Sequence, residues 1–472
     1  MKKLLLTLVC GLASNLLAGE YLVEFYKTGN GELAQFTKIH GGSLNLVSRA
    51  GNLYKWTVSS DSNPLSISDN NIVHIQKNNS IRLIENPSLA KNQEALRELA
   101  RTNKLQITDG PAYPDNPEIT SSVTQATGKD PMLTKQWGFA QINGAQAQGL
   151  SPQGKNIVVA VTDTGVDYTH QDLVNQMWRN EKEIPGNGVD DDKNGYIDDI
   201  VGWDFASDDN KPYDLSMSLI DILMGGGNPG HGTHVAGVIG AAANNAMGII
   251  GVAPRVKIMA LRFITEKGQG TTEAAIKAVD YAVENGAHII NASWGGEKGE
   301  EGDEELLKAI ERAKAKGVLF IAAAGNGRPD QAAGKSIGFN NDTDPKPVLP
   351  ASFNLENMIT VAAIDVGQKL GEFSNFGPKS VHIGAPGVNI LSTVPGNKYQ
   401  DVIIELGTMK ITWDGTSMAA PHVAGAVALL WSIDPNMTAV TAKNKLLSMT
   451  VKIPALSGKT VTEGRLDLSG IK

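Results

Sequence analysis

Apolar runs between residues 156 and 322 constrain the fold of this chain more than any other feature. They cover residues 156–162, 256–261, 288–291 and 318–322, without regular alternation of apolar and polar side chains. Such runs are typical of parallel strands that are buried on both faces. Helical patterns at residues 272–285 and 304–316 separate the last three runs. This alternation predicts an α/β domain with helices on both faces of a mostly parallel sheet, and ligands bound beyond the carboxyl ends of its strands.

Residues 1–19 have the pattern of a secretory signal peptide. Lys2 and Lys3 precede an apolar core at residues 4–17, which small residues follow. The core is too short for a permanent membrane span. Cys10, the only cysteine among the 472 residues, lies inside this segment, so the mature chain would have no disulfide. We expect export to a periplasm or to the extracellular space; a lipid on Cys10 is the alternative.

The rest of the chain divides into a small module, a linker and a large domain. Residues 20–85 are predicted to form an α+β module, with strands at 21–25 and 53–58, a helix at 31–40 and strand residues at 72–75 and 80–84. Residues 86–130 contain prolines and a Ser/Thr run without an apolar pattern, which indicates an exposed linker. The α/β domain would occupy residues 131–472. The net charge of −8 argues against nucleic acid as a partner.

Three short motifs supply an acid, a base and a nucleophile. Asp163 follows the strand that ends at Thr162, His231 opens a helix after a glycine-rich loop, and Ser417 lies at the start of a helix of small residues. Serine becomes a nucleophile when an imidazole takes its proton, and the imidazole needs a carboxylate to fix its tautomer. Pro421 leaves the Ser417 carbonyl without its helical partner, which is easiest to accept beside an open cleft. The motifs therefore predict a catalytic triad.

These motifs resemble the signature blocks of the subtilisin-like serine proteases, in that family's order. The matching segments are Asp-Thr-Gly at 163–165, His-Gly-Thr-His at 231–234 and Gly-Thr-Ser-Met-Ala-Ala-Pro-His at 415–422, and the resemblance covers roughly residues 131–445. It implies a subtilisin-like three-layer domain in which Asp163 orients the base, His231 is the general base and then the acid, and Ser417 forms an acyl-enzyme. A fourth block at 322–326 implies that the Asn326 amide stabilises the oxyanion, a contact typically worth about 3 to 4 kcal/mol of barrier.

The resemblance also implies two edges that bind an extended polypeptide substrate. Segments 268–270 and 291–296 would pair with the substrate backbone as neighbouring strands. The implied substrate-binding residues are Gly268, Gln269, Gly270, Ser293, Trp294 and Gly295. The Trp294 ring would either wall an apolar pocket or pack in the core.

Two loops suggest structural calcium. Segment 190–199 has oxygen-bearing side chains at alternate positions and a glycine, like the first part of an EF-hand loop without its closing glutamate; a solvated acidic turn is the alternative. Segment 243–254 resembles the family's calcium loop, with no clear match for the amino-terminal ligand. The predicted ligands are Asp190, Asp192, Asn194 and Asp198 in the first loop, and Asp172, Ala243, Asn245, Met247 and Ile249 at the second.

By its position and size the module at residues 20–85 resembles the propeptide of these proteases; an unrelated binding module is the alternative. The linker at 86–130 would contain the processing site. The sequence thus predicts a secreted, self-processing serine endopeptidase with structural calcium, whose partners are polypeptide substrates and its own propeptide. The rivals are an aspartic protease, which would need a second acid motif and an all-β fold, and a catalytically silent homologue that only binds peptides or a partner.

Overall fold

The computed structural model describes residues 19–58, 64–84, 86–88, 127–149, 153–217, 222, 227–299, 303–330, 332–406 and 409–471. The predicted signal peptide up to residue 18 and most of the predicted linker lie outside these residues. The chain divides into two compact units, Met1–Asn78 and Asn79–Lys472.

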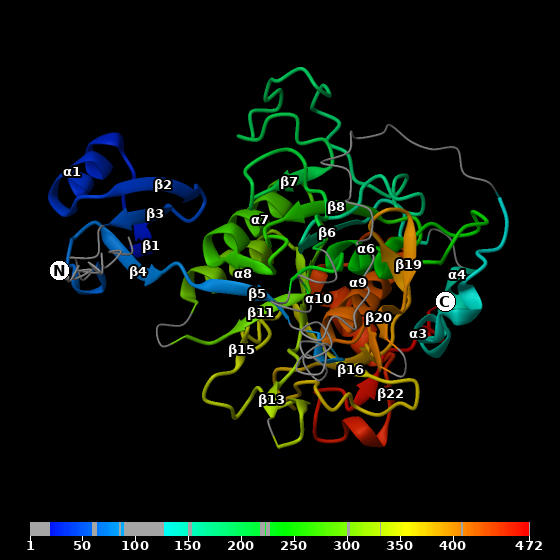
Figure 1. The fold of residues 1–472 in the computed structure, drawn as a ribbon. Coiled ribbons are helices and arrows are strands. Elements are labelled where there is room, and N and C mark those ends of the chain that lie inside the picture. Colours follow the sequence, from blue (N-terminus) through cyan, green and yellow to red (C-terminus); the bar gives the residue numbers. More distant parts are fainter. Residues whose placement is uncertain are drawn as a thin grey trace, which may run out of the picture. The chain divides into compact units, whose positions relative to one another are not determined.

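The first unit is a four-stranded antiparallel sheet with one helix (Figure 1, blue). The strand order is β2 (Ser43–Ser48), β3 (Leu53–Val58), β1 (Gly19–Phe25) and β4 (Ile72–Lys77), and the helix is α1 (Asn30–His40), with a short 3-10 turn η1 (Pro64–Ser66). Phe36 of α1 joins Val23, Phe25, Trp56 and Val58 in one buried core. Its ring centroid lies 5.0 Å from the rings of Phe25 and Trp56. The unit has the α+β character predicted for residues 20–85, and it ends at Asn78.

The second unit is built on a nine-stranded sheet of the described residues. In spatial order its strands are β22 (Val451–Lys452), β23 (Gly464–Arg465), β17 (Ile383–Pro386), β16 (Met358–Ile364), β12 (Leu319–Ala323), β10 (Ile289–Ala292), β6 (Val158–Asp163), β8 (Lys257–Arg262) and β7 (Gly202–Asp204). Every neighbouring pair is parallel except β22 and β23. All residues of β10, β12 and β16 are buried, which explains their continuous apolar sequence.

Helices cover both faces of this sheet, as the sequence predicts. Figure 1 shows α7 (Thr272–Glu284) and α8 (Glu304–Ala315) on one face, and α6 (His231–Gly240), α9 (Thr416–Ile433) and α10 (Ala439–Ser448) on the other. Among the described residues α9 alone is long and apolar enough to cross a membrane, and 94% of it is buried inside the fold. Its small residues allow close packing: a Cβ on Gly425 would lie 2.7 Å from Val252 Cβ and 3.1 Å from the Ile239 carbonyl oxygen. The fold is therefore the expected three-layer α/β domain.

A second, antiparallel sheet lies in the same unit. Its order is β15 (Val348–Leu349), β11 (Trp294–Glu297), β5 (Ser80–Leu83) and β9 (Gln269–Thr271). The strand expected near residues 80–84 therefore forms, and it pairs with strands of the large unit. The remaining elements are η2 (Leu133–Lys135), α3 (Trp137–Gln141), α4 (Gly144–Gln148), η3 (Pro454–Leu456), and the hairpins β13 (Arg328–Asp330) with β14 (Lys335–Ile337), β18 (Ser392–Val394) with β19 (Lys398–Gln400), and β20 (Val402–Leu406) with β21 (Met409–Thr412).

Candidate active site at the carboxyl edge of the sheet

Asp163 and His231 meet at the carboxyl end of β6. Asp163 is the last residue of β6, His231 is the first residue of α6, and both are buried. His231 Nδ1 lies 2.7 Å from Asp163 Oδ1. This contact places the imidazole proton on Nδ1 and leaves Nε2 as the basic nitrogen. His231 Nε2 has no hydrogen-bond partner among the described residues, so it is available to accept a proton.

A buried carboxylate that the sequence analysis did not identify, Asp214, holds the start of α6. Asp214 Oδ2 accepts from Thr233 N at 2.8 Å and Thr233 Oγ1 at 2.6 Å, and Oδ1 accepts from Thr164 Oγ1 at 2.8 Å and Asn228 Nδ2 at 2.6 Å. Asn228 Oδ1 in turn accepts from the His231 main-chain amide at 2.7 Å. Burial raises the pKa of Asp214 to about 6. No motif marks this residue, because residues 215–230 separate it from the histidine block.

Ser417 is the second residue of α9 and lines the same cavity as His231, of about 230 Å³. Ser417 Oγ donates to the carbonyl oxygen of Ser293, which lies between β10 and β11, at 3.0 Å. The structure therefore brings Ser417 and His231 to one cavity, and Asp163 contacts the imidazole at Nδ1. The serine hydroxyl is bonded to a main-chain carbonyl rather than to the imidazole.

Ser293 supplies the hydrogen bond that Pro421 cannot donate. Pro421 lies inside α9 and has no amide hydrogen for the Ser417 carbonyl one turn earlier. Ser293 Oγ donates to that carbonyl oxygen at 2.9 Å, and both serines are buried. The carbonyl of this cavity-lining residue is thus bonded to a side chain, a partner that the sequence analysis did not identify.

Asn326 follows β12 and is oriented by Thr416. Asn326 Oδ1 accepts from Thr416 N and Thr416 Oγ1, each at 2.9 Å. These two bonds make Nδ2 the donor end of the amide. A Cβ on Gly415 would lie 3.0 Å from Nδ2, so glycine at that position leaves room beside the amide. The geometry places a donor near the backbone that leads to Ser417.

The other buried histidines near the cavity have structural contacts. His234 Nε2 lies 2.9 Å from the Ile390 carbonyl oxygen, and its ring stacks on Trp413 at 4.2 Å. His422 Nδ1 lies 2.8 Å from the Met418 carbonyl oxygen. Burial lowers the pKa of His234 to about 3 and that of His422 to about 4, so both are neutral near pH 7. His231 remains the candidate base.

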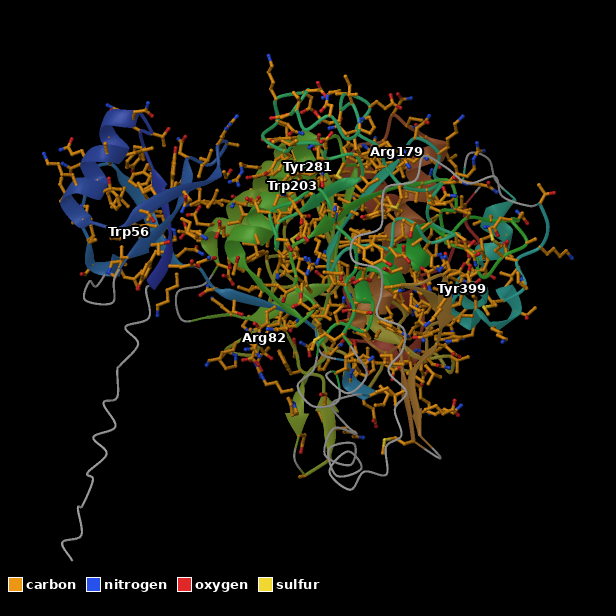
Figure 2. The ribbon with its side chains drawn as sticks, turned by 45° about the horizontal axis from the view of Figure 1, so that its top comes forward. Trp56, Arg82, Arg179, Trp203, Tyr281 and Tyr399 are labelled. Carbon is orange, nitrogen blue, oxygen red and sulfur yellow. The ribbon has the colours of Figure 1, made fainter. Side chains whose placement is uncertain are left out.

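The predicted substrate-binding edges hold a strand of this chain. Strand β5 lies between β9 and β11, with Arg82 opposite both Gln269 and Gly295 and Ile81 opposite Gly270 (Figure 2, where Arg82 marks β5). The Leu83 amide also donates to the Gly268 carbonyl at 2.9 Å. Two separated edges therefore bind one extended polypeptide through main-chain pairing.

Trp294 packs in the core, which is the second of the two alternatives from the sequence. Its side chain is fully buried, its ring lies edge-on at 4.9 Å from the ring of Phe263, and Nε1 donates to Thr162 Oγ1 at 3.1 Å. Only its backbone faces β5, opposite Leu83.

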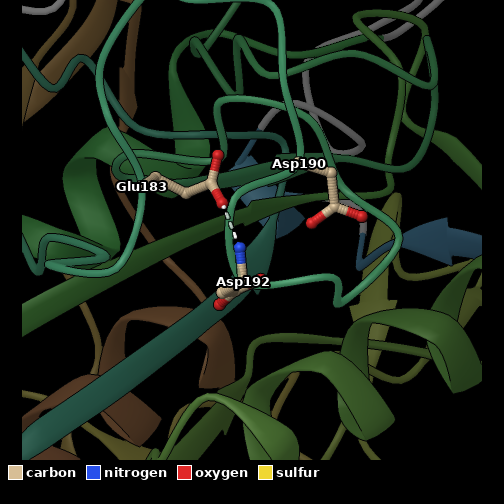
Figure 3. Close-up of side chains that lie close together, drawn as sticks. All are labelled: Glu183, Asp190 and Asp192. Atoms are coloured by element: carbon tan, nitrogen blue, oxygen red, sulfur yellow. Dashed lines mark hydrogen bonds between the residues drawn. The ribbon is translucent and has the colours of Figure 1, made fainter.

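The acidic loop gathers three carboxylates, one of which the sequence analysis missed. Oxygens of Glu183, Asp190 and Asp192 lie within 4.8 Å of one another (Figure 3). The Asp198 oxygens instead accept amides at residues 187 and 188, and Asn194 Oδ1 accepts the amide of residue 196. Glu183 also accepts the amides of Asp192 and Asp198, each at 3.0 Å, so its carboxylate is bonded to the acidic loop. Three clustered carboxylate oxygens suit a hard cation such as calcium.

At the second calcium loop the structure brings Asp172 and Asn245 together and adds Asp130. Asn245 Nδ2 donates to Asp172 Oδ1 at 2.5 Å, and the Asp130 oxygens accept the amides of Asn244 and Asn245 at 2.9 and 3.0 Å. Burial, together with the charge of Asp172, raises the pKa of Asp130. Ala243, Met247 and Ile249 lie on the loop after α6. Asp130 thus lies beside this loop, for which the sequence had no clear match for an amino-terminal ligand.

Comparisons with known proteins agree with this architecture. The Peptidase S8 model, described as the subtilase family, matches residues 154–465. Subtilisin-like protease 2 of Plasmodium falciparum (isolate 3D7) is 34% identical over 344 residues, which is 71% of this chain and 22% of that protein. The thermophilic serine proteinase of Bacillus sp. (strain AK1) is 33% identical over 341 residues, 72% of this chain and 67% of that protein. The chain thus spans only about a fifth of the length of the first relative.

A solved structure shares the fold. Fervidolysin from Fervidobacterium pennivorans, described as a keratinolytic enzyme related to subtilisin, superposes with a TM-score of 0.65. The match covers 95% of this chain and 60% of that one at 24% sequence identity. The family model matches most of the large unit, and both the identity to relatives and the shared fold agree with it. This chain therefore belongs to the subtilase family.

Proposed function

We propose that this chain is an exported serine endopeptidase that cleaves polypeptides through an acyl-enzyme on Ser417. The observation that carries the proposal is the 2.7 Å contact between Asp163 and His231 at a cavity that Ser417 also lines, with a polypeptide strand paired beside it. Family membership supports a serine-type peptidase; the roles of the individual residues are part of the proposal.

The reaction follows from this geometry in two steps. A rotation about the Cα–Cβ bond of Ser417 brings Oγ to His231 Nε2, which takes the hydroxyl proton as Oγ attacks the substrate carbonyl carbon. The carbon–nitrogen bond then breaks, and His231 gives the proton to the leaving amine. Water next attacks the acyl-enzyme with His231 again as base, which releases a carboxylic acid and restores Ser417. Asp163 stabilises the imidazolium in each step.

Asn326 is proposed as a donor to the oxyanion. Charge develops on the substrate carbonyl oxygen when Oγ attacks, and a fixed amide aimed at that oxygen stabilises the transition state more than the ground state. The two bonds from Thr416 to Asn326 Oδ1 hold the amide in one orientation, so little reorganisation is needed during the reaction.

We propose the first unit as a propeptide and β5 as the segment by which the chain occupies its own cleft. Pairing of β5 with β9 and β11 uses main-chain groups that any extended substrate has, which supports broad binding of polypeptides. The predicted processing site at residues 86–130 stays a proposal, as does export directed by residues 1–19.

Calcium is proposed at both loops as a structural ion. Glu183, Asp190 and Asp192 would hold it at the acidic loop, and Asp130 and Asp172 at the second loop. At the second loop the Asn245 amide would have to turn over to present its oxygen, because Nδ2 now faces Asp172. A bound ion would stabilise the folded chain by mass action and take no part in the reaction.

A catalytically silent homologue that only binds peptides is the second candidate. The observation that favours it is the bond from Ser417 Oγ to the Ser293 carbonyl, since a serine held there is not activated by His231.

One experiment separates the two candidates. Full-length wild type and Ser417→Ala are expressed with the signal segment, and their intact masses, casein hydrolysis and labelling by a serine-reactive fluorophosphonate are compared. We expect hydrolysis, labelling and loss of the first unit only in the wild type. Equal trimming in both chains would mean that another protease processes them. Absence of hydrolysis and labelling in a folded wild type would favour the silent homologue.

A further inference from the structure

The first turn of α7 binds the main chain at the start of β5. Strand β5 pairs with β9 from Ser80 to Arg82, and β9 runs directly into α7 at Thr272. The Thr272 amide donates to the Asn79 carbonyl oxygen at 2.9 Å. Amides at the start of a helix have no partner within the helix, so this one is available to a neighbouring strand. The edge that binds a polypeptide therefore extends from β9 onto α7.

Asp303 binds the side chain at the same position. Asn79 Nδ2 donates to Asp303 Oδ1 at 2.7 Å. Asp303 is the N-cap residue of α8, where an aspartate carboxylate usually accepts an amide of the first turn, but its side chain makes no such bond. Thr272 Oγ1 lies 3.4 Å from Asp303 Oδ1 and 3.4 Å from the Asn79 carbonyl oxygen. The Asp303 carboxylate is thus directed at the bound segment and not at its own helix.

The chemistry around Asp303 determines which side chain can bind there. Thr272 is fully buried and Asp303 is partly buried. Burial raises the pKa of Asp303, and the bonds from Asn79 and Thr272 lower it. An ionised carboxylate can only accept hydrogen bonds, so its partner must be a donor. Since α8 continues with Glu304 and Glu305, a further carboxylate at this position would be repelled.

Asn79 occupies a place that a substrate residue can take. The groups that bind it belong to α7 and α8, so they stay in place when a substrate strand replaces β5 between β9 and β11. Ile84, at the other end of the bound segment, lines the cavity that Ser417 and His231 also line. A substrate whose first residue before the cut lies at the place of Ile84 therefore has its sixth residue at the place of Asn79.

We propose that Asp303 and Thr272 form a specificity subsite, which selects polypeptides with an amide or cationic side chain at the sixth position before the cut. This inference rests on the proposed endopeptidase function, because it concerns substrates of the same cleft. The Thr272 amide holds the substrate main chain at this position, and the Asp303 carboxylate accepts from the side chain. Residues that lack a donor, or that carry a carboxylate, bind less tightly at this end of the cleft.

The test uses chromogenic peptides in which the reporter fixes the bond that is cut. The parent peptide has the sequence of residues 78–84 with a p-nitroanilide on the residue that corresponds to Ile84, and the enzyme is the wild-type chain brought to constant hydrolysis of casein. Changing Asn79 to Ala in the peptide should lower kcat/KM by about tenfold, since a hydrogen bond to a charged group is lost. Changing it to Asp should lower kcat/KM at least as far. Changing the exposed Ser80 to Ala, the matched control, should alter kcat/KM by less than about twofold.

The enzyme variant Asp303→Ala completes the cycle. Its ratio of kcat/KM between the parent peptide and the Asn79→Ala peptide should fall from about ten towards one, because the carboxylate that accepts from the amide is gone. Glu304→Ala is the control at the next residue, where the carboxylate lies 3.3 Å from Lys308 Nζ. This control should keep the ratio of the wild type.

Two safeguards keep the inference open to refutation. If Asp303→Ala does not fold, the peptide series on the wild type still decides. If the wild type cleaves none of the anilides, the same peptides without the reporter are compared as inhibitors of casein hydrolysis, and the parent should have an inhibition constant about tenfold lower than that of the Asn79→Ala peptide. Equal values for these two peptides, or an unchanged ratio in Asp303→Ala, overturn the inference while casein hydrolysis leaves the proposed function intact. A folded wild type that does not hydrolyse casein would refute the proposed function itself.

Discussion

Replacing Ser293 with alanine should leave the main-chain carbonyl of Ser417 without its donor. That carbonyl belongs to a buried residue, and Pro421 cannot donate to it, so the bond from Ser293 Oγ at 2.9 Å takes the place of the helical one. A buried carbonyl without a partner costs about 1 to 3 kcal/mol. Ser293 Oγ also accepts from Asn291 Nδ2 at 3.0 Å, and loss of that bond adds about 1 kcal/mol. We expect Ser293→Ala to lower the unfolding free energy by about 2 to 4 kcal/mol.

A second substitution can return the missing donor. Pro421→Ala restores the amide hydrogen that an α-helix directs at the carbonyl four residues earlier, which is that of Ser417. When Pro421→Ala is already present, adding Ser293→Ala should therefore lower the unfolding free energy only by the amount due to the lost bond from Asn291. The expected coupling energy between the two substitutions is about 1 to 3 kcal/mol.

Urea unfolding of the four chains in a Ser417→Ala background measures this coupling without self-digestion. Ser392 provides a matched control, since its buried hydroxyl donates to the His234 carbonyl at 2.7 Å and shares no partner with Pro421. Ser392→Ala should lose stability with no coupling to Pro421→Ala. Additive effects of Ser293→Ala and Pro421→Ala would refute the claim that the serine replaces the helical amide.

Three further predictions concern the oxyanion donor, the buried acid and the acidic loop. Asn326→Leu should lower kcat on a peptide substrate about 10²- to 10³-fold with little change in KM, and an unchanged kcat would remove its assigned role. Burial raises the pKa of Asp214 to about 6, so the folded state holds its proton more tightly than the unfolded state. The stability that Asp214 contributes should therefore be complete below about pH 4 and should decline by up to about 3 kcal/mol as the pH rises to 6. Urea unfolding across this pH range measures the decline, which should be absent in Asp214→Asn. A chelator should lower the melting temperature of the wild type more than that of Glu183→Gln, which lacks one carboxylate of the acidic cluster. The control Glu181→Gln, changed at an exposed position, should respond like the wild type. Equal shifts in all three chains would argue against an ion at this loop.

The sequence by itself determined the layer architecture and the candidate reacting groups. Continuous apolar runs predict buried parallel strands. A strand that is buried on both faces has no solvent-exposed side, so its apolar and polar residues do not alternate. The histidine block and the serine block are each an unbroken run of residues. The local geometry at the start of α6 and of α9 could therefore be predicted from these residues alone.

Only the tertiary structure decided which distant side chains bind to the candidate groups. Asp214 reaches the start of α6 from a separate loop, and Ser293 reaches a carbonyl 124 residues away. Glu183 joins the carboxylate cluster of the acidic loop, while Asp198 accepts main-chain amides instead. Each is an ordinary polar residue in the sequence, with no fixed spacing to the group that it binds. Buried donors and acceptors need hydrogen-bond partners, and which of them still lack one is decided only after the strands and helices have packed. These pairings therefore depend on the folded structure and not on sequence spacing.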